Sequence, residues 1–308
     1  ITISVEGVDK NFIKLAIQAS VNFKVSGTAE AVRRAAHRFP SQQASLNQII
    51  QQALEGSLRS IIGNLPIQEI ISNRNALSEA MLTALAERLA EIDGDDEVHV
   101  VILAGAGPAF SAGHDLREIR ADDDPAFHER LFARCSDVMM QVGHLRQPVI
   151  ARVSGVATAA GCQLVASCDL AVAGATARFA TPGVNIGLFC STPMVALTRT
   201  VGPKHAMEML LTGELIDATD AHRIGLVNRV VPDQALDSAT AALAATIAAK
   251  SPLTVAMGKA AYRNQRDLPV AEAYAHTSGV MVDNLQADDA AEGIAAFLDR
   301  RPPTWTGR

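Results

Sequence analysis

The sequence predicts an α/β protein with a mostly parallel sheet, preceded by a small α+β segment. Three apolar runs with strand character lie at 98–105, 148–155 and 169–175. Amphipathic helical patterns separate them, and strands that alternate with helices form parallel sheets with helical crossovers. Residues 1–25 instead alternate apolar and polar positions, which is typical of paired antiparallel strands.

The first 74 residues contain two predicted strands and two predicted helices. The strands flank the polar stretch "GVDKN" within residues 1–25. Apolar residues between Leu46 and Ile62 recur on one face of a helix, and the short segment 66–71 forms another after Gly63.

From residue 75 the pattern changes to helix, strand and helix in turn. The run "VHVVILAG" is rich in β-branched residues, which predicts a strand buried on both faces. Alanine-rich helices follow the last strand up to the C-terminus. The predicted helices of the middle part are 76–92, 125–145 and 159–168.

Composition restricts the function classes. With 308 residues, 48% of them hydrophobic and 19% charged, the chain has material for a large core. A net charge of -6 provides no basic surplus for a phosphate backbone, so we expect no nucleic-acid partner. No apolar run reaches the length of a membrane span, and we expect no transmembrane segment.

The four cysteines predict neither a disulfide framework nor a metal site. None is spaced as a CxxC pair or grouped with histidines, so we expect reduced thiols, most of them buried and inert, and no bound metal. The four are Cys135, Cys162, Cys168 and Cys190.

Two loops that follow predicted strands, 104–119 and 154–165, are candidates for a functional site. Ligands of open α/β sheets collect at the carboxyl ends of the strands. A loop that leads into a helix leaves peptide N–H groups free, and two such loops side by side can stabilise an oxyanion. On the residues alone, tight turns for close packing are the simpler interpretation of these loops.

Four motifs in this part of the chain resemble the crotonase, or enoyl-CoA hydratase/isomerase, superfamily in order and spacing. They are "FSAGHDL", "PVIARVSGVATAAGCQLVASCDLAVA", "ARFATPGVNIGL" and "EGIAAFLDRRPP". The second and third are most similar to the branch called enoyl-CoA hydratase domain-containing protein 3. The resemblance implies a spiral of repeated ββα units with C-terminal helices, and it covers the chain from about Arg74 onward.

The resemblance also implies a ligand and an assembly. It implies an acyl-CoA or enoyl-CoA thioester as ligand and no prosthetic cofactor, because the substrate itself carries coenzyme A. Homotrimers or hexamers are implied as well. The expectation of reduced thiols indicates the cytoplasm as the compartment, or the mitochondrial matrix if the source is eukaryotic.

Site residues carry over from the resemblance by position. The peptide N–H groups of His114 and Ala160 stand at the oxyanion hole, and Gln163 and Gly183 occupy the positions of two catalytic glutamates. The neighbouring residues implied to bind substrate are Ala112, Gly113, Asp115, Leu116 and Gly161. Glutamine does not exchange a proton at neutral pH and glycine has no side chain, so ordinary hydration of an enoyl thioester is doubtful.

Few other groups near these positions can move a proton. No Asp or Glu lies between Arg178 and Lys204, which leaves His114, Asp115, Asn185 and two cysteines as candidates. The imidazole of His114 titrates near neutrality, although a packing role is the simpler interpretation. Asp115 most simply caps the helix that follows it. Basic residues that could meet the CoA phosphates, with solvated charges as the default interpretation, are Lys204, Lys259, Arg300 and Arg301.

The front of the chain resembles another family. "QASVNFKVSGTAEAVRRAAHRF" and "IIQQALEGSLRSIIGNLPIQEIISNR" resemble the closing strands and helices of an SPFH, or band 7, domain. We therefore expect an SPFH-like fragment over 1–74 and a crotonase-like domain over 75–308, with its helical part from about 235. A divergent extension that mimics the pattern is the alternative.

Three functions remain open at this point. The chain is an enzyme of CoA thioesters that handles protons without the usual glutamates, or a non-catalytic protein that binds acyl-CoA. The third is an oligomerising, membrane-associated protein with the crotonase-like part as passenger.

Overall fold

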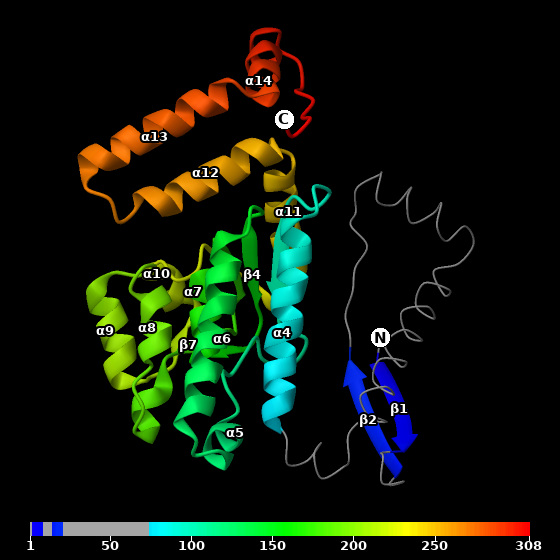
Figure 1. Ribbon diagram of the computed structural model, residues 1–308, viewed down its shortest axis with the longest axis vertical. Coiled ribbons are helices and arrows are strands. Elements are labelled where there is room, and N and C mark those ends of the chain that lie inside the picture. The colour runs from blue at the N-terminus through cyan, green and yellow to red at the C-terminus, as the bar shows by residue number, and fades with distance from the viewer. Residues whose placement is uncertain (1, 9–13, 21–73) are drawn as a thin grey trace. The chain divides into compact units, whose positions relative to one another are not determined.

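A computed structural model describes residues 2–8, 14–20 and 74–308 (Figure 1). The chain divides into two compact units, Ile1–Ser78 and Glu79–Arg308. The helices predicted between Leu46 and Ile62 and over 66–71 lie outside the described residues.

In the first unit the described residues form a strand pair. Strand β1 (Thr2–Val8) pairs antiparallel with β2 (Lys14–Ser20), with Thr2 opposite Ser20 and Val8 opposite Lys14. The alternation of apolar residues predicted this pair, and the prediction is confirmed.

The second unit contains two sheets. Strands β3 (Val101–Ala104), β4 (Val149–Val153), β6 (Leu170–Gly174) and β9 (Arg229–Val231) form a parallel sheet in the order β3-β4-β6-β9. Strands β5 (Val156–Thr158), β7 (Arg178–Ala180) and β8 (Ile216–Asp217) form another, in which β7 pairs parallel with β5 and antiparallel with β8. The mostly parallel α/β architecture is confirmed. Two or three residues show no periodicity, so the short strands were not located from sequence.

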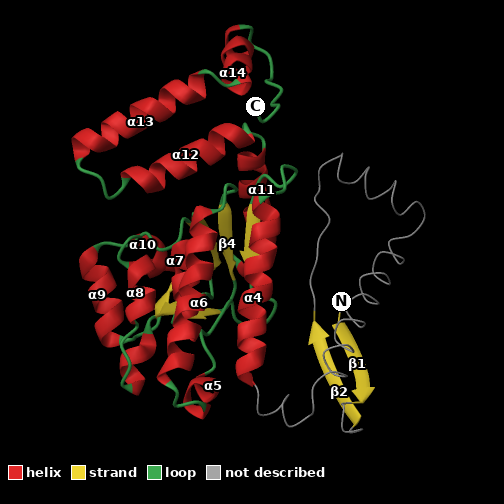
Figure 2. Cartoon of the chain, viewed as in Figure 1, coloured by secondary structure: helices red, strands yellow, loops and turns green. Residues whose placement is uncertain are grey.

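Helices cover these sheets (Figure 2). Figure 1 shows α12, α13 and α14 together at one end of the second unit, away from the sheets. The helices are α4 (Arg74–Asp93), α5 (Leu116–Ala121), α6 (Pro125–His144), α7 (Ala160–Ser167), α8 (Ser191–Leu197), α9 (Pro203–Thr212), α10 (Ala218–Arg223), α11 (Leu236–Ala248), α12 (Pro252–Gln265), α13 (Val270–Leu285) and α14 (Asp288–Leu298), with 3-10 turns η1 (Pro182–Ile186) and η2 (Asp233–Ala235).

Strand β3 corrects one prediction. It lies at the edge of its sheet and its side chains alternate between partly buried and exposed, with Ile102 43% exposed. Val101 and Leu103 pack against the core from the other face. The β-branched run therefore predicted the strand correctly, but the predicted burial on both faces is wrong. An edge strand has one neighbouring strand, so fewer helices pack over its faces.

Strand β4 is the centre of the core. Val149, Ile150, Ala151 and Val153 are fully buried. Each large side chain buried in this way stabilises the fold by about 1.5–3 kcal/mol. The loops that follow β3 and β4 therefore start from a rigid base.

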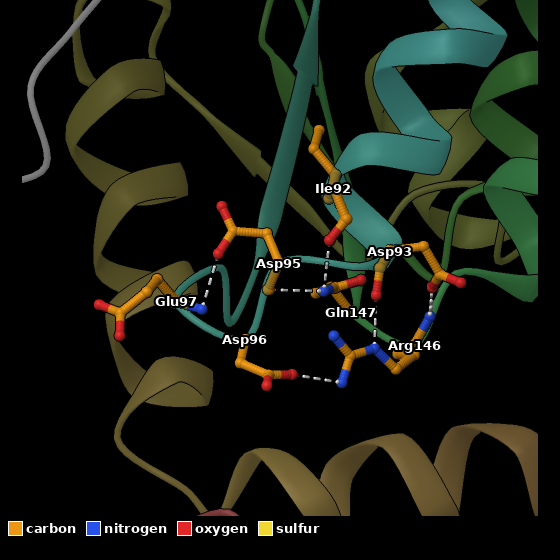
Figure 3. Close-up of polar contacts among 7 residues, drawn as sticks. All are labelled: Ile92, Asp93, Asp95, Asp96, Glu97, Arg146 and Gln147. Atoms are coloured by element: carbon orange, nitrogen blue, oxygen red, sulfur yellow. Dashed lines mark hydrogen bonds and ion pairs between the residues drawn. The ribbon is translucent and has the colours of Figure 1, made fainter.

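The turn between α4 and β3 is tied to the start of β4 (Figure 3). The Arg146 peptide N–H donates to Asp93 Oδ1 at 2.8 Å, and its guanidinium donates to the Asp93 carbonyl and to Asp96 Oδ1. The amide of Gln147, 4% exposed, donates to the carbonyl of Ile92 at 2.8 Å. These contacts hold the two chain segments that enter β3 and β4 next to each other.

A partly buried ion cluster anchors α12. The carboxylate of Asp169 pairs with Lys259 Nζ at 2.7 Å and Arg263 Nη2 at 2.9 Å, and accepts the peptide N–H of Val149. Burial lowers the pKa of Lys259, and the charge of Asp169 opposes that shift. Lys259 is thus engaged inside the fold and does not present its ammonium group to a CoA phosphate.

Two searches of the described residues returned no candidate. Within 2–8, 14–20 and 74–308 no group of His, Cys, Asp and Glu is arranged to hold a metal ion. No single helix in this part of the chain has the length and apolar character to cross a membrane; residues 233–248 and 252–265, bent by 101°, pass only as a pair.

Candidate active site at two loop–helix junctions

The N-terminus of α7 carries the first candidate donor. Ala159 precedes the helix with φ 50° and ψ -118°, a conformation that an L-residue rarely adopts. Its peptide N–H donates to the Ala180 carbonyl at 3.0 Å, and no side chain caps the helix. The N–H of Ala160 has no acceptor among the described residues, so it is free to bind a ligand oxygen.

The loop after β3 carries the second candidate donor. Gly113 has φ +91°, which suits glycine, and its N–H lies 3.3 Å from Ser111 Oγ. The peptide N–H of His114 likewise has no acceptor in the described part of the chain. Asp115 then caps α5, because its Oδ1 accepts the Arg117 N–H at 2.9 Å, which confirms the predicted capping role.

The two loops are in direct contact. The Thr158 N–H donates to the Ser111 carbonyl at 2.9 Å, and Thr158 Oγ1 donates to the Ala112 carbonyl at 3.2 Å. A Cβ built on Gly113 would lie 3.2 Å from the Ala160 nitrogen, and one built on Gly161 would lie 2.1 Å from the Ser111 carbonyl oxygen. Glycine at these positions therefore brings the free N–H groups of the two junctions close together.

Gln163 lies one turn into α7 and is buried. Its side chain is 4% exposed, and its Oε1 has no hydrogen-bond partner among the described residues. The hydroxyl of Thr181, 1% exposed, is unpartnered in the same sense. Buried polar atoms of this kind commonly bind ordered water or a ligand.

Gly183 is buried in η1, and the space for a side chain there is already filled. The Gly183 N–H donates to Cys190 Sγ at 3.3 Å, and the Leu188 N–H donates to the Gly183 carbonyl at 3.0 Å. A Cβ at this position would lie 2.8 Å from the Leu188 carbonyl oxygen and 3.0 Å from Cys190 Sγ. A glutamate therefore does not fit at this position without a backbone shift.

The cysteines are buried thiols, as predicted for most of them. Burial raises the pKa of Cys162 to about 12 and that of Cys135 to about 11, and it also raises the pKa of Cys190, which the Gly183 N–H partly opposes. They are protonated at neutral pH and are poor nucleophiles.

The imidazole of His114 is partly buried beside α6. It meets the ring of Phe132 edge-on, with centroids 5.6 Å apart and planes at 89°. Burial lowers the pKa of His114, which favours the neutral ring. The Nε2 atom is buried and has no hydrogen-bond partner among the described residues.

The other predicted site residues surround these junctions in sequence. Ala112, Asp115 and Leu116 are exposed, whereas Gly161 is buried. Asn185 donates to the Gly213 carbonyl at 3.3 Å, which is a packing contact between η1 and the end of α9.

Sequence reasoning passed over two buried polar residues. Thr181 stands before Pro182, and nothing in a Thr-Pro pair indicates burial. Glu118 is 3% exposed on α5, three residues after the helix cap. Nothing in the segment 116–121 singled this side chain out as buried.

Comparison with known proteins identifies the family. The family model described as enoyl-CoA hydratase/isomerase matches residues 70–308. The chain belongs to the enoyl-CoA hydratase/isomerase family. It is 47% identical over 240 residues to the rat mitochondrial enoyl-CoA hydratase domain-containing protein 3, covering 77% of this chain and 80% of the relative. The human protein of that name is 48% identical over 240 residues, covering 77% of this chain and 79% of the relative.

Solved structures show the same fold. The crystal structure of human enoyl-CoA hydratase domain-containing protein 3 has a TM-score of 0.72 and 48% identity, and covers 73% of this chain and 89% of that chain. An enoyl-CoA hydratase from Mycobacterium smegmatis has a TM-score of 0.72 and 53% identity. The match covers 74% of this chain and 88% of that chain. The crotonase-like fold and the similarity to this branch are confirmed.

The front of the chain matches a second family model. The model for the SPFH domain, or band 7 family, matches residues 1–101, which overlaps the first match. The resemblance of the front segment to that domain is therefore present in the comparison as well.

Proposed function

We propose that this family member binds the thioester of an acyl-CoA or enoyl-CoA and holds its carbonyl oxygen with the peptide N–H groups of His114 and Ala160. The observation that carries the proposal is the contact of the two loop–helix junctions, each with a free N–H. Two peptide donors aimed at one oxygen stabilise an enolate or a tetrahedral oxyanion.

The reaction proposed is enolate chemistry rather than addition of water. Hydration of a double bond needs one group that takes a proton from the attacking water and one that protonates the carbon. Gln163 and Gly183 supply neither. An oxyanion hole alone still lowers the barrier to removal of a proton next to the thioester carbonyl. Isomerisation or proton exchange of a CoA thioester is compatible with such a site.

Binding of acyl-CoA without turnover is the second candidate. The observation that favours it is the filled space at Gly183, together with thiols of raised pKa at Cys162 and Cys190. A protein of this kind acts as a sensor or scaffold.

Assembly and compartment complete the proposal. Helices α13 and α14 expose large apolar side chains, among them Tyr274 at 72% and Phe297 at 83%, which supports association of copies as a homotrimer or hexamer. We place the protein in the cytoplasm, or in the mitochondrial matrix for a eukaryotic source, because the relatives above are named as mitochondrial.

No prosthetic group is part of the proposal. Residues 1–74 form the SPFH-like fragment and residues 75–308 the crotonase-like domain.

A binding and turnover experiment on the full chain tests the proposal. Butyryl-CoA affinity is measured by calorimetry, and conversion of crotonyl-CoA by the loss of absorbance of the conjugated thioester. We expect butyryl-CoA binding with little hydration. Absence of any binding contradicts the proposal, and fast hydration contradicts the reaction class.

The variant Gln163→Glu tests the role of the missing acid. This substitution conserves the length and shape of the side chain. No glutamate is introduced at position 183, because Gly183 has no room for a side chain. We expect binding to persist and hydration of crotonyl-CoA to rise above that of the parent. Gln163→Leu is the matched control, which removes the polar group without adding an acid.

A further inference from the structure

The side chain of His114 is not explained by packing alone. Its ring is edge-on to Phe132, yet its Nε2 is buried without a hydrogen-bond partner among the described residues. An unsatisfied buried polar atom costs about 1–3 kcal/mol. Such a cost at a candidate active site points to a group that acts on a ligand.

Covalent geometry limits the distance between this ring and the reacting part of a bound thioester. The peptide nitrogen and the imidazole of His114 extend from one Cα, so bond lengths keep the ring nitrogens within about 5–6 Å of that nitrogen. The α-carbon of a thioester is two bonds from the oxygen that the N–H would hold. The α-hydrogen therefore lies within reach of a ring nitrogen that turns toward the ligand.

We propose that the imidazole of His114 is the group that removes and returns the α-proton of the bound thioester. A ring nitrogen lone pair takes the proton and the C–H bond breaks. Its electron pair forms a double bond between the α-carbon and the carbonyl carbon, and the π pair of the C=O bond moves to the oxygen held by the two peptide N–H groups. The imidazolium exchanges its proton with solvent and then protonates the enolate carbon. Atoms and charges balance without another reactant, and this inference rests on the proposed thioester site.

Asp115 and the two cysteines near the site are less suited to remove a proton. Asp115 is occupied as the cap of α5, and Cys162 and Cys190 are protonated thiols in apolar surroundings. Glu118 is a buried carboxylate on α5 and is the main competitor. The neutral ring of His114 is the form that a general base requires at neutral pH.

Exchange of deuterium into butyryl-CoA tests the assignment. The full chain is incubated with butyryl-CoA in D2O, and the α-carbon deuterium content is followed by mass spectrometry, with affinity measured in parallel. We expect His114→Asn to keep butyryl-CoA binding within a few-fold and to lose about 100-fold or more of the exchange rate. His144→Asn is the matched control, since His144 is exposed at the end of α6, and we expect no change.

A second variant separates catalysis from packing. His114→Ala removes the ring, and added imidazole is expected to restore part of the exchange rate, which a purely structural role does not predict. Loss of exchange in Glu118→Gln but not in His114→Asn would overturn the assignment. It is also overturned if the parent binds butyryl-CoA without exchange. Failure of the parent to bind butyryl-CoA is a different result and contradicts the proposed thioester site itself.

Discussion

The start of α7 and the η1 turn both contain residues with small or no side chains, but they differ in what occupies the space beside those residues. At the α7 junction the small residues Gly113, Ala159 and Gly161 let two loops meet while two peptide N–H groups stay free. At η1 the sulfur of Cys190 and the Leu188 carbonyl occupy the space that a side chain on Gly183 would take. Loss of side-chain volume thus leaves a binding position in one region and a closed packing contact in the other.

The difference teaches that Gln163 and Gly183, the two positions for which the family resemblance implies glutamates, are not equivalent. Gln163 retains nearly the shape of a glutamate, and its buried Oε1 has no partner in the described part of the chain. Gly183 has become part of the packing of the loop that surrounds it. The proposed site therefore depends mainly on its peptide donors.

The largest effect is expected for Gly113→Ala. The new Cβ would lie 3.0 Å from the Ala159 Cβ and 3.2 Å from the Ala160 nitrogen, on a backbone with φ +91°. Displacing one oxyanion donor lowers rates by about 100- to 1000-fold. We expect a loss of that size in α-proton exchange of butyryl-CoA. Gly258→Ala on α12, with no atom within 4 Å of its Cβ, is the control and should leave exchange unchanged.

A smaller effect, on stability, is expected for Gly183→Ala. Overpacking against the Leu188 carbonyl should lower the free energy of unfolding by about 1–3 kcal/mol. Urea denaturation measures the change. Gly279→Ala on α13 has open space at its Cβ and should instead be neutral or stabilising. If both variants have the same stability as the parent, the space at Gly183 is not filled as described.

Ala159→Gly should act in the opposite direction. Glycine relieves a positive φ that costs an alanine about 1–3 kcal/mol, and the greater freedom of glycine in the unfolded chain offsets about 0.5–1 kcal/mol of that gain. We expect a net stabilisation of about 1 kcal/mol in thermal unfolding. The Ala159 Cβ is one of the contacts of a Gly113→Ala side chain. The double variant should therefore be more stable than the sum of the two single changes in unfolding free energy predicts. Strict additivity would contradict the close approach of the loops.

The smallest effect is a pH dependence that comes from His114. Burial lowers its pKa below 6.5, so the unfolded chain binds more protons than the folded one between these two values. The corresponding stability is present above pH 6.5 and is lost as the pH falls toward the lowered pKa. His114→Asn should therefore lose less stability than the parent between pH 7.5 and 5.5 in urea titrations. An identical slope would contradict the burial of the ring.

Local sequence was sufficient for much of the fold. The alternation in residues 1–25, the helical patterns of 76–92 and 125–145, and the apolar runs of β4 and β6 indicated their elements because such patterns are a local property of the sequence. The capping role of Asp115 and the burial of Cys162 were predicted for the same reason. The short strands β5 and β7 and the edge position of β3 were not predictable, since they depend on neighbours distant in the chain.

The sequence by itself determined which chemical groups this protein has, among them Gln163, Gly183 and two small-residue loops ahead of helices. Only the tertiary structure decided how those groups are buried and which of them are in contact. It brought the free N–H groups of His114 and Ala160 to adjoining loops, placed Cys190 in the space at Gly183, and buried Gln163, His114 and Thr181 to different depths. The physical reason is that contact and burial are set by packing between distant segments, whereas a sequence pattern records only the preferences of near neighbours.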